Sequence, residues 1–319
     1  MRQRLLRIAR GPVVIAAVIA VGLVVIGGIL RPGFADPDQV VSMLRIASFL
    51  GIIAIGQTIV VLSGGEGIDL SVGTVATLSA IIAARVMDGA NAGALGGVLL
   101  AVGVAAVIGL VNGLGVVFLR IPPFVMTLGM MGVVSGLILV VTGGVADGRA
   151  APVLIDLVSG RGVLGVPGIV LLWIVLTAAV VLLLRRTGYG WSLHAVGANR
   201  EAARLSGVPV ARTRVLAYVL CSAFAAIGGI AMLGYTQTVF LSLADGQMMP
   251  SIAAVIIGGT LVSGGVGGVL GTGIGAVVLT VLNSLLTTLT IPESTRTVVN
   301  GLVLIVLLAV YGRQRRLRA

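Results

Sequence analysis

Two carboxylates and a flexible backbone interrupt an apolar region of the sequence. The stretch LSGGEGIDLSVG, residues 62–73, carries Glu66 and Asp69 among four glycines, and long apolar runs flank it on both sides. One charged side chain at mid-membrane costs about 3 kcal/mol on insertion scales, so a span tolerates two acids, but lipid exposure is not expected. The chemistry that such a stretch offers is hydrogen bonding from a broken helix that faces the protein interior or water.

The role of this stretch has two open interpretations. Gly64 and Gly65 permit a helix break, and the following DLS is typical of a helix start, where Asp69 or Ser71 accepts hydrogen bonds from free amides. Asp69 is then either an N-cap and nothing more, or part of a route for a polar solute. The candidate pathway residues of the second interpretation are Gly64, Gly65, Glu66, Asp69, Ser71, Asn112 and Asn283.

Several other chemistries are excluded by the residues that the chain lacks. It has no Lys, which a Walker A loop needs to reach phosphates, so the chain has no P-loop of its own. Its one Cys and one His, Cys221 and His194, make neither a disulfide nor a plausible zinc site, and no HExxH motif is present. We therefore expect no catalytic residues, no metal and no bound cofactor.

The composition predicts that membrane-spanning helices hold the polar residues named above in place. The 319 residues are 58% hydrophobic and only 10% charged, with a mean hydropathy of +1.20. Soluble domains are about 25% charged, so this is an all-α polytopic membrane protein. The net charge of +11 does not indicate nucleic acid, because the Arg residues cluster at both termini and in one central loop.

The apolar runs predict about ten transmembrane segments in a single permease domain, 1–319. The eighth segment is short for a full crossing and is expected to be a half-helix. An even number of segments puts both Arg-rich termini and the central loop on the cytoplasmic side, and most acids, including Asp245, on the other. The ten segments are 12–30, 43–62, 70–87, 93–117, 122–142, 163–184, 212–234, 248–262, 267–289 and 296–312.

An internal repeat relates the two halves of the chain. Asn112 aligns with Asn283, and Ile121–Pro122 aligns with Ile291–Pro292, each after a Gly-rich run. Five segments separate the two matches, so the halves would form an inverted five-plus-five repeat with broken or half helices. Such repeats are typical of transporters whose solute path lies at the repeat interface. The alternative is coincidence in a sequence of low diversity.

The central polar loop, about 185–214, predicts a short capped helix. Asn199 is a good N-cap and Gly207 a good C′ residue, with Pro209 two residues later. A short capped helix at the membrane surface suits docking into a groove of another protein, whereas the plain alternative is a solvated connector. The candidate docking residues are Asn199, Arg200, Glu201, Ala202, Ala203, Arg204 and Gly207.

Four stretches resemble the membrane permeases of ribose-type ABC sugar importers. They are GGEGIDLSVG, RIPPFVMTLGMM, GYGWSLHAVGANREAARLSGVPV and AAVIIGGTLVSGGVGGVLGT, in the order expected for that family, and the resemblance covers roughly 43–312. One departure is Glu66, which lengthens the usual GGIDLSVG pattern.

The resemblance implies a multi-pass permease of the bacterial cytoplasmic membrane. It implies a homodimer, or a pair of related permeases, on two cytoplasmic ATPase subunits that hydrolyse the ATP, with an extracytoplasmic solute-binding protein that delivers the sugar. The loop helix from Asn199 to Gly207 then corresponds to the segment that engages the ATPase. The alternative is an ion-coupled secondary transporter, which would share inverted repeats and broken helices.

Overall fold

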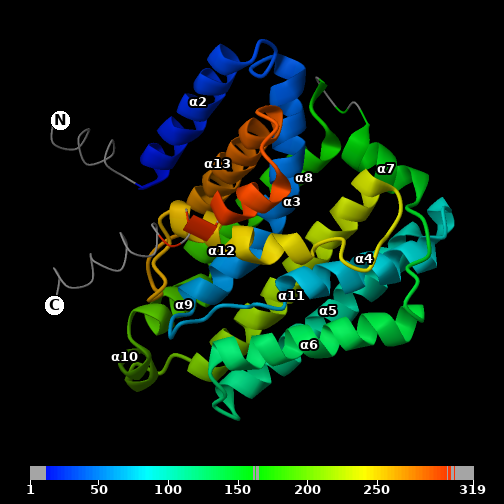
Figure 1. Cartoon of the computed structure of the whole chain (residues 1–319). Coiled ribbons are helices and arrows are strands. Elements are labelled where there is room, and N and C mark those ends of the chain that lie inside the picture. Colours follow the sequence, from blue (N-terminus) through cyan, green and yellow to red (C-terminus); the bar gives the residue numbers. More distant parts are fainter. Residues whose placement is uncertain (1–11, 161, 163–164, 300, 303–304, 306–319) are drawn as a thin grey trace, which may run out of the picture.

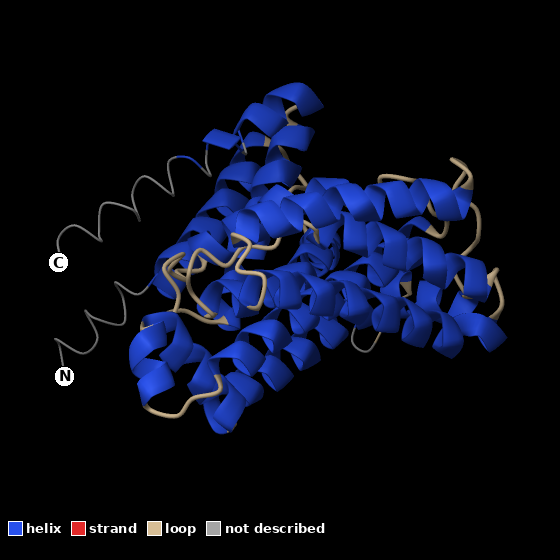
Figure 2. Ribbon diagram, turned by 90° about the horizontal axis from the view of Figure 1, so that it is seen from below, coloured by secondary structure: helices blue, strands red, loops and turns tan. Residues whose placement is uncertain are grey.

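The computed structural model describes residues 12–160, 162, 165–299, 301–302 and 305, and all regular elements of this part are helices (Figure 2). Seven helices are long and apolar enough to cross a membrane: α2 (Pro12–Leu30), α3 (Pro37–Leu62), α5 (Ala94–Val117), α6 (Pro123–Thr142), α8 (Gly168–Arg186), α11 (Val210–Thr236) and α13 (Val269–Thr288). The shorter helices are α4 (Val72–Met87), α7 (Pro152–Ser159), α9 (Gly188–Ala198), α10 (Arg200–Leu205) and α12 (Met248–Ile257), and single 3-10 turns form η1 (Asn91–Gly93) and η3 (Asp245–Gln247).

These helices confirm an all-helical, multi-span architecture but not the full set of ten spans. Nine of the predicted segments coincide with helices, yet α4 and α12 are too short to cross the hydrocarbon unaided. At 1.5 Å per residue, the ten residues of α12 extend about 15 Å, half of a 30 Å core. The tenth segment, 296–312, lies largely outside the described residues. The helices α7 and α9 were not predicted.

Proline marks where several helices begin, and this explains the shifted boundaries. Helix α3 begins at Pro37, directly after Asp36, rather than at residue 43. Pro is favourable at the first helical position because it loses no hydrogen bond there. Pro123 opens α6 in the same way, and Pro167 precedes α8, which starts at Gly168 instead of residue 163.

The core of the bundle forms around α11, which packs against α3, α4 and α5 (Figure 1). Small residues permit these close approaches. A Cβ on Gly229 of α11 would collide with the backbone of Ala76 in α4, and a Cβ on Gly109 of α5 would meet the backbone of Tyr218 at 2.5 Å. Close backbone approach at small residues is how membrane helices associate without a hydrophobic driving force.

The two halves of the chain share the local structure of one turn. Arg120 and Thr290 each precede an Ile-Pro pair, and both have a left-handed φ, of 57° and 58°. In each turn the C=O of the Pro accepts a hydrogen bond from the residue four positions later, Met126 or Arg296. This match supports the alignment of the repeats at these positions, while their inverted arrangement stays a prediction.

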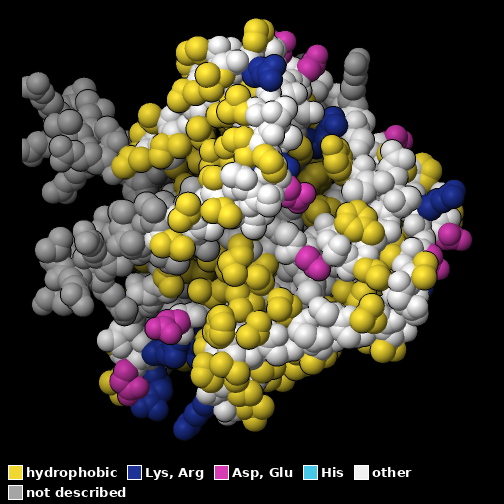
Figure 3. Space-filling view, viewed as in Figure 1, with side chains coloured by type: hydrophobic (Ala, Val, Ile, Leu, Met, Phe, Trp, Pro, Cys, Tyr) yellow, Lys and Arg dark blue, Asp and Glu magenta, His cyan; other side chains and the backbone are white. Residues whose placement is uncertain are grey.

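The surface divides into apolar and charged regions. Apolar side chains cover much of the face in Figure 3, and most charged side chains lie near its margins. Acidic and basic side chains gather at lower left, where Figure 1 shows α10. This distribution is the one expected of helices that expose their flanks to lipid and their connecting loops to water.

Candidate functional site

The predicted helix break is confirmed between α3 and α4. Helix α3 ends at Leu62, and the chain then passes through three consecutive left-handed residues, Gly64, Gly65 and Glu66, with φ of 74°, 62° and 58°. Only glycine adopts this region without cost, so the two glycines make the turn possible and Glu66 extends it by one residue. Helix α4 begins ten residues after α3 ends, at Val72.

The break separates the two acids that the sequence places together. Glu66 is exposed, whereas Asp69 is completely buried. The Asp69 Oδ1 accepts hydrogen bonds from the backbone N–H of Ser71 at 2.9 Å and from the Ser71 hydroxyl at 2.6 Å. Asp69 therefore binds Ser71 in the turn just before α4, whereas the N-cap of α4 is Ser71 itself, whose side chain bonds no amide of the helix.

Side chains from two neighbouring helices hold the capping turn in place. With its amide in the orientation that satisfies both groups, Gln57 of α3 donates to the C=O of Asp69 and accepts from its N–H, each at 3.2 Å. Asn112 of α5 donates to the Ser71 hydroxyl at 3.1 Å. All four side chains are buried.

Replacement of Asp69 should distinguish the hydrogen bonds from the charge. We expect Asp69→Asn to retain most of the stability, since its amide oxygen still accepts from Ser71, and Asp69→Ala to lose about 2 kcal/mol, because the Ser71 N–H is left without a partner. Thermal unfolding of the detergent-purified protein measures both. Equal losses in the two variants would show that the charge, rather than the cap, is required.

The central polar loop contains the predicted capped helix. The Asn199 Oδ1 accepts from the N–H of Ala202 at 3.0 Å and begins α10, which ends at Leu205. Gly207 follows with a φ of 80°, and Arg204 forms an exposed ion pair with Glu201 at 2.6 Å. Of the predicted docking residues, Ala203 alone is buried; the others, including Arg200 and Ala202, are exposed on the surface of the loop.

A junction of three glycine backbones joins this loop to the helix break. Gly197, near the end of α9, contacts Gly64 in the break and Gly265 in the loop between α12 and α13. The N–H of Gly265 donates to the C=O of Leu62 at 3.0 Å, and the Arg200 Nη2 donates to the C=O of Gly64 at 3.3 Å. Side chains would not fit here, because backbone atoms of Leu62, Gly64 and Gly265 surround Gly197.

The predicted pathway residues do not all come together. Gly64, Gly65, Asp69, Ser71 and Asn112 lie in or against the break. Asn283, by contrast, donates to the C=O of Leu279 within its own helix, α13. Asn112 and Asn283, although aligned in the repeat, therefore serve different local structures.

Asp245, an exposed residue, lies beside Thr77 in the first half of α4. The single proton of the Thr77 hydroxyl is shared between the C=O of Gly73 at 3.1 Å and the Asp245 Oδ1 at 3.2 Å. The side of the membrane on which Asp245 lies stays a prediction.

A family model described as "Branched-chain amino acid transport system / permease component" matches residues 39–308. The ribose import permease protein RbsC of Bacillus subtilis (strain 168) is 34% identical over 286 residues, 89% of this chain and 88% of that protein. RbsC of Escherichia coli (strain K12) is 32% identical over 92% of this chain and 91% of its own. The autoinducer 2 import system permease protein LsrC of Escherichia coli (strain K12 / DH10B) is 33% identical over 94% of this chain and 87% of that protein.

No solved structure gives a significant match. The matches to the family model and to the import permeases extend across α3, the break, α10 and α13, so they include every part of the candidate site. The chain belongs to the family of permease components typified by the branched-chain amino acid transport systems.

Proposed function

We propose that this chain is the permease subunit of an ATP-binding-cassette importer that moves a monosaccharide or a related small polar solute across the inner membrane. The observation that carries the proposal is the similarity to two kinds of import permease, RbsC and LsrC, over about nine-tenths of the chain. The similarity supports an importer permease and not the ion-coupled secondary transporter. The ribose that RbsC imports by name makes a pentose the first solute to test.

The partners follow from this role. The permease acts with an ATPase and with an extracytoplasmic solute-binding protein, and we propose two ATPase copies beneath a permease homodimer or a pair with a related permease. ATP is then hydrolysed by the partner, and this chain binds no cofactor. The exposed, capped α10 supports docking there, because its backbone ends are satisfied by Asn199 and Gly207 and leave its side chains free for contact.

In the proposed topology, both termini and α10 lie in the cytoplasm. The Arg-rich termini and central loop support this orientation. The single permease domain would contain two inverted halves, supported by the matched Ile-Pro turns. The proposed pathway passes the break at Gly64–Ser71, where Asp69 and Asn112 form hydrogen bonds with Ser71.

A pull-down tests the importer assignment. The tagged protein, extracted in mild detergent from its native membrane, should bring with it a P-loop ATPase identified by mass spectrometry. Alteration of the Asn199–Gly207 segment should abolish that recovery, since α10 is the proposed docking element. Recovery of the permease alone, with uptake that a protonophore stops and ATP depletion does not, would contradict the proposal.

A further inference from the structure

The chain re-enters the bundle between α11 and α12. At the far end of α4, the N–H of Gly89 donates to the C=O of Arg149, and the N–H of Ala150 donates to the C=O of Gln237, which follows α11. Only a few residues later, Asp245 contacts Thr77. Gly89 and Thr77 are separated by about 18 Å along α4, at 1.5 Å per residue. The segment 238–247 therefore descends from one end of the bundle toward its middle.

The re-entrant segment is anchored against α4. The N–H of Ala244 donates to the Thr77 hydroxyl at 3.0 Å, and a Cβ on Gly73 would meet the C=O oxygens of Ala244 and Asp245 at 3.0 and 3.2 Å. Non-helical backbone at membrane depth is tolerated only where protein covers it or where it lines an aqueous cavity. The re-entrant segment satisfies this condition on one side by its contact with α4.

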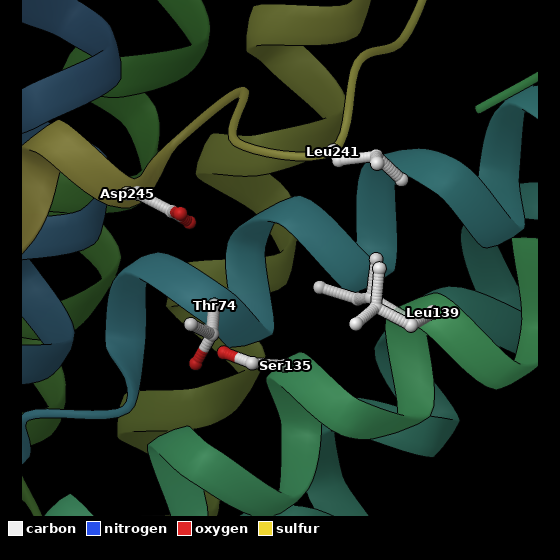
Figure 4. A pocket seen from close by; sticks show the side chains of 6 residues that line it. Thr74, Ser135, Leu139, Leu241 and Asp245 are labelled. Atoms are coloured by element: carbon white, nitrogen blue, oxygen red, sulfur yellow. The ribbon is translucent and has the colours of Figure 1, made fainter. Parts of the chain in front are cut away.

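On its other side the re-entrant segment borders a cavity of about 140 Å³. Thr74 of α4, Ser135 of α6 and Asp245 supply its polar wall, and Ile138, Leu139 and Leu241 supply its apolar wall. In Figure 4 the Ser135 hydroxyl is directed toward Thr74, and the Asp245 carboxylate projects from the segment that closes the opposite side. One water molecule needs about 10–15 Å³ of such space, so the cavity has room for several waters or for part of a solute.

The wall of the cavity is rich in hydrogen-bond acceptors. The Thr74 hydroxyl donates to the C=O of Ser71 at 3.0 Å, so it presents its lone pairs to the cavity. The Thr77 hydroxyl shares its one proton between the C=O of Gly73 and Asp245 Oδ1, so both oxygens of the Asp245 carboxylate can accept from a solute. Ser135 both donates and accepts. Such a wall recognises groups that carry several O–H donors, while the apolar side chains suit a face of C–H bonds.

This cavity is not a surface for lipid. An ionised Asp exposed to hydrocarbon costs about 3 kcal/mol for insertion, and ionisable residues inside a membrane therefore face water, a partner or a substrate route. Hydrogen bonds connect the cavity wall to the break, because Thr74 bonds to Ser71, which bonds to Asp69 and Asn112. Ser71, Thr74 and Thr77 lie at three-residue intervals and so share one face of the chain.

We propose that the cavity lined by Thr74, Ser135 and Asp245 is a transit subsite for a neutral polyhydroxylated solute, whose hydroxyl groups donate to Asp245 and Thr74. The inference rests on the proposed importer function. It specifies the class of solute and a position in the permease where the solute binds. The 3-10 turn η3 begins at Asp245 and leads directly into the short helix α12, so this carboxylate lies where the re-entrant segment ends.

The test uses the complete importer in proteoliposomes, with labelled ribose as the probe. We expect Asp245→Leu to reduce ATP-driven uptake about tenfold or more, because a charge-assisted hydrogen bond is lost, and Asp245→Asn to reduce it only about threefold, because an amide oxygen still accepts. The matched control is Asp156→Leu in α7, an exposed acid outside the cavity, which should retain full uptake. Every variant must recover the ATPase in the pull-down.

Labelling of an introduced thiol measures binding independently of transport. In Ser135→Cys, ribose at ten times its dissociation constant should slow modification by a methanethiosulfonate reagent about tenfold. The control Asp156→Cys should show no protection, and the native Cys221 is buried and adds little background.

The outcomes separate the subsite from the importer assignment. Wild-type uptake of ribose driven by ATP, together with full uptake in Asp245→Leu and no protection of Ser135→Cys, would overturn the subsite alone. Protection by a monovalent cation but not by ribose would also overturn it as a hydroxyl-binding site. Absence of ATP-driven ribose uptake in the unaltered complex would overturn the proposed solute class itself.

Discussion

Gly207→Pro is expected to abolish ATP-driven uptake while the permease still inserts in the membrane. Gly207 ends α10 with a φ of 80°, its N–H donates to the C=O of Arg204, and the N–H of Val208 donates to the C=O of Ala203, both at 3.0 Å. This is a complete Schellman motif. Proline fixes φ near −65° and has no N–H, so it removes one bond and reverses the dihedral that the other requires.

The loss of uptake in Gly207→Pro should be large, because few interactions besides the two caps stabilise α10. A helix of six residues is unstable in isolation, so α10 depends on its two caps and on the packing of Ala203. A penalty of about 3 kcal/mol reduces the population of the docking conformation more than a hundredfold. Uptake by the reconstituted importer, with ATPase recovery in a pull-down, measures the effect.

Gly207→Asn is the matched control for Gly207→Pro. Asn tolerates the left-handed region and keeps its N–H, and a side chain at this position meets nothing within 4 Å. We expect it to retain uptake within about threefold, since the change in conformational preference is small. Normal uptake in Gly207→Pro would show that α10 does not carry the coupling contact.

Elements that are specified by residues close together in the sequence could be predicted from the sequence. The caps of α10 are specified by Asn199 and Gly207, which belong to the few residue types that suit those positions, so the helix could be predicted to within one residue. The break after Leu62 could be predicted for the same reason, because consecutive glycines and buried polar residues interrupt an otherwise apolar run.

Contacts between distant segments could not be predicted in this way. Nothing in the neighbours of Gln57 indicates that its amide pairs with the backbone of Asp69, since that contact depends on how α3 folds against the break. The contact of Thr77 with Asp245 is of the same kind, because it joins residues 168 positions apart in the sequence.

Gly197→Ala should disrupt the junction between the central polar loop and the helix break. A Cβ at Gly197 would collide with the C=O oxygen of Leu62 and with the N–H of Gly265, which bond to each other at 3.0 Å. Both obstacles are backbone, so neither yields by a side-chain rotation. We expect a loss of about 3 kcal/mol or more of folding free energy, because three segments must separate to accept one methyl group.

Gly188→Ala in the same helix is the matched control, since a Cβ there meets nothing within 4 Å. Alanine is the better helix former by up to about 1 kcal/mol, so this variant should be neutral or slightly stabilised. Thermal unfolding in detergent compares the two. If Gly197→Ala were as stable as Gly188→Ala, the junction would have to open without cost, and α9 could then move without displacing the end of α3. If it is destabilised as expected, the backbone contact at Gly64 makes the docking helix and the break one mechanical unit, which is what an importer driven by a separate ATPase requires.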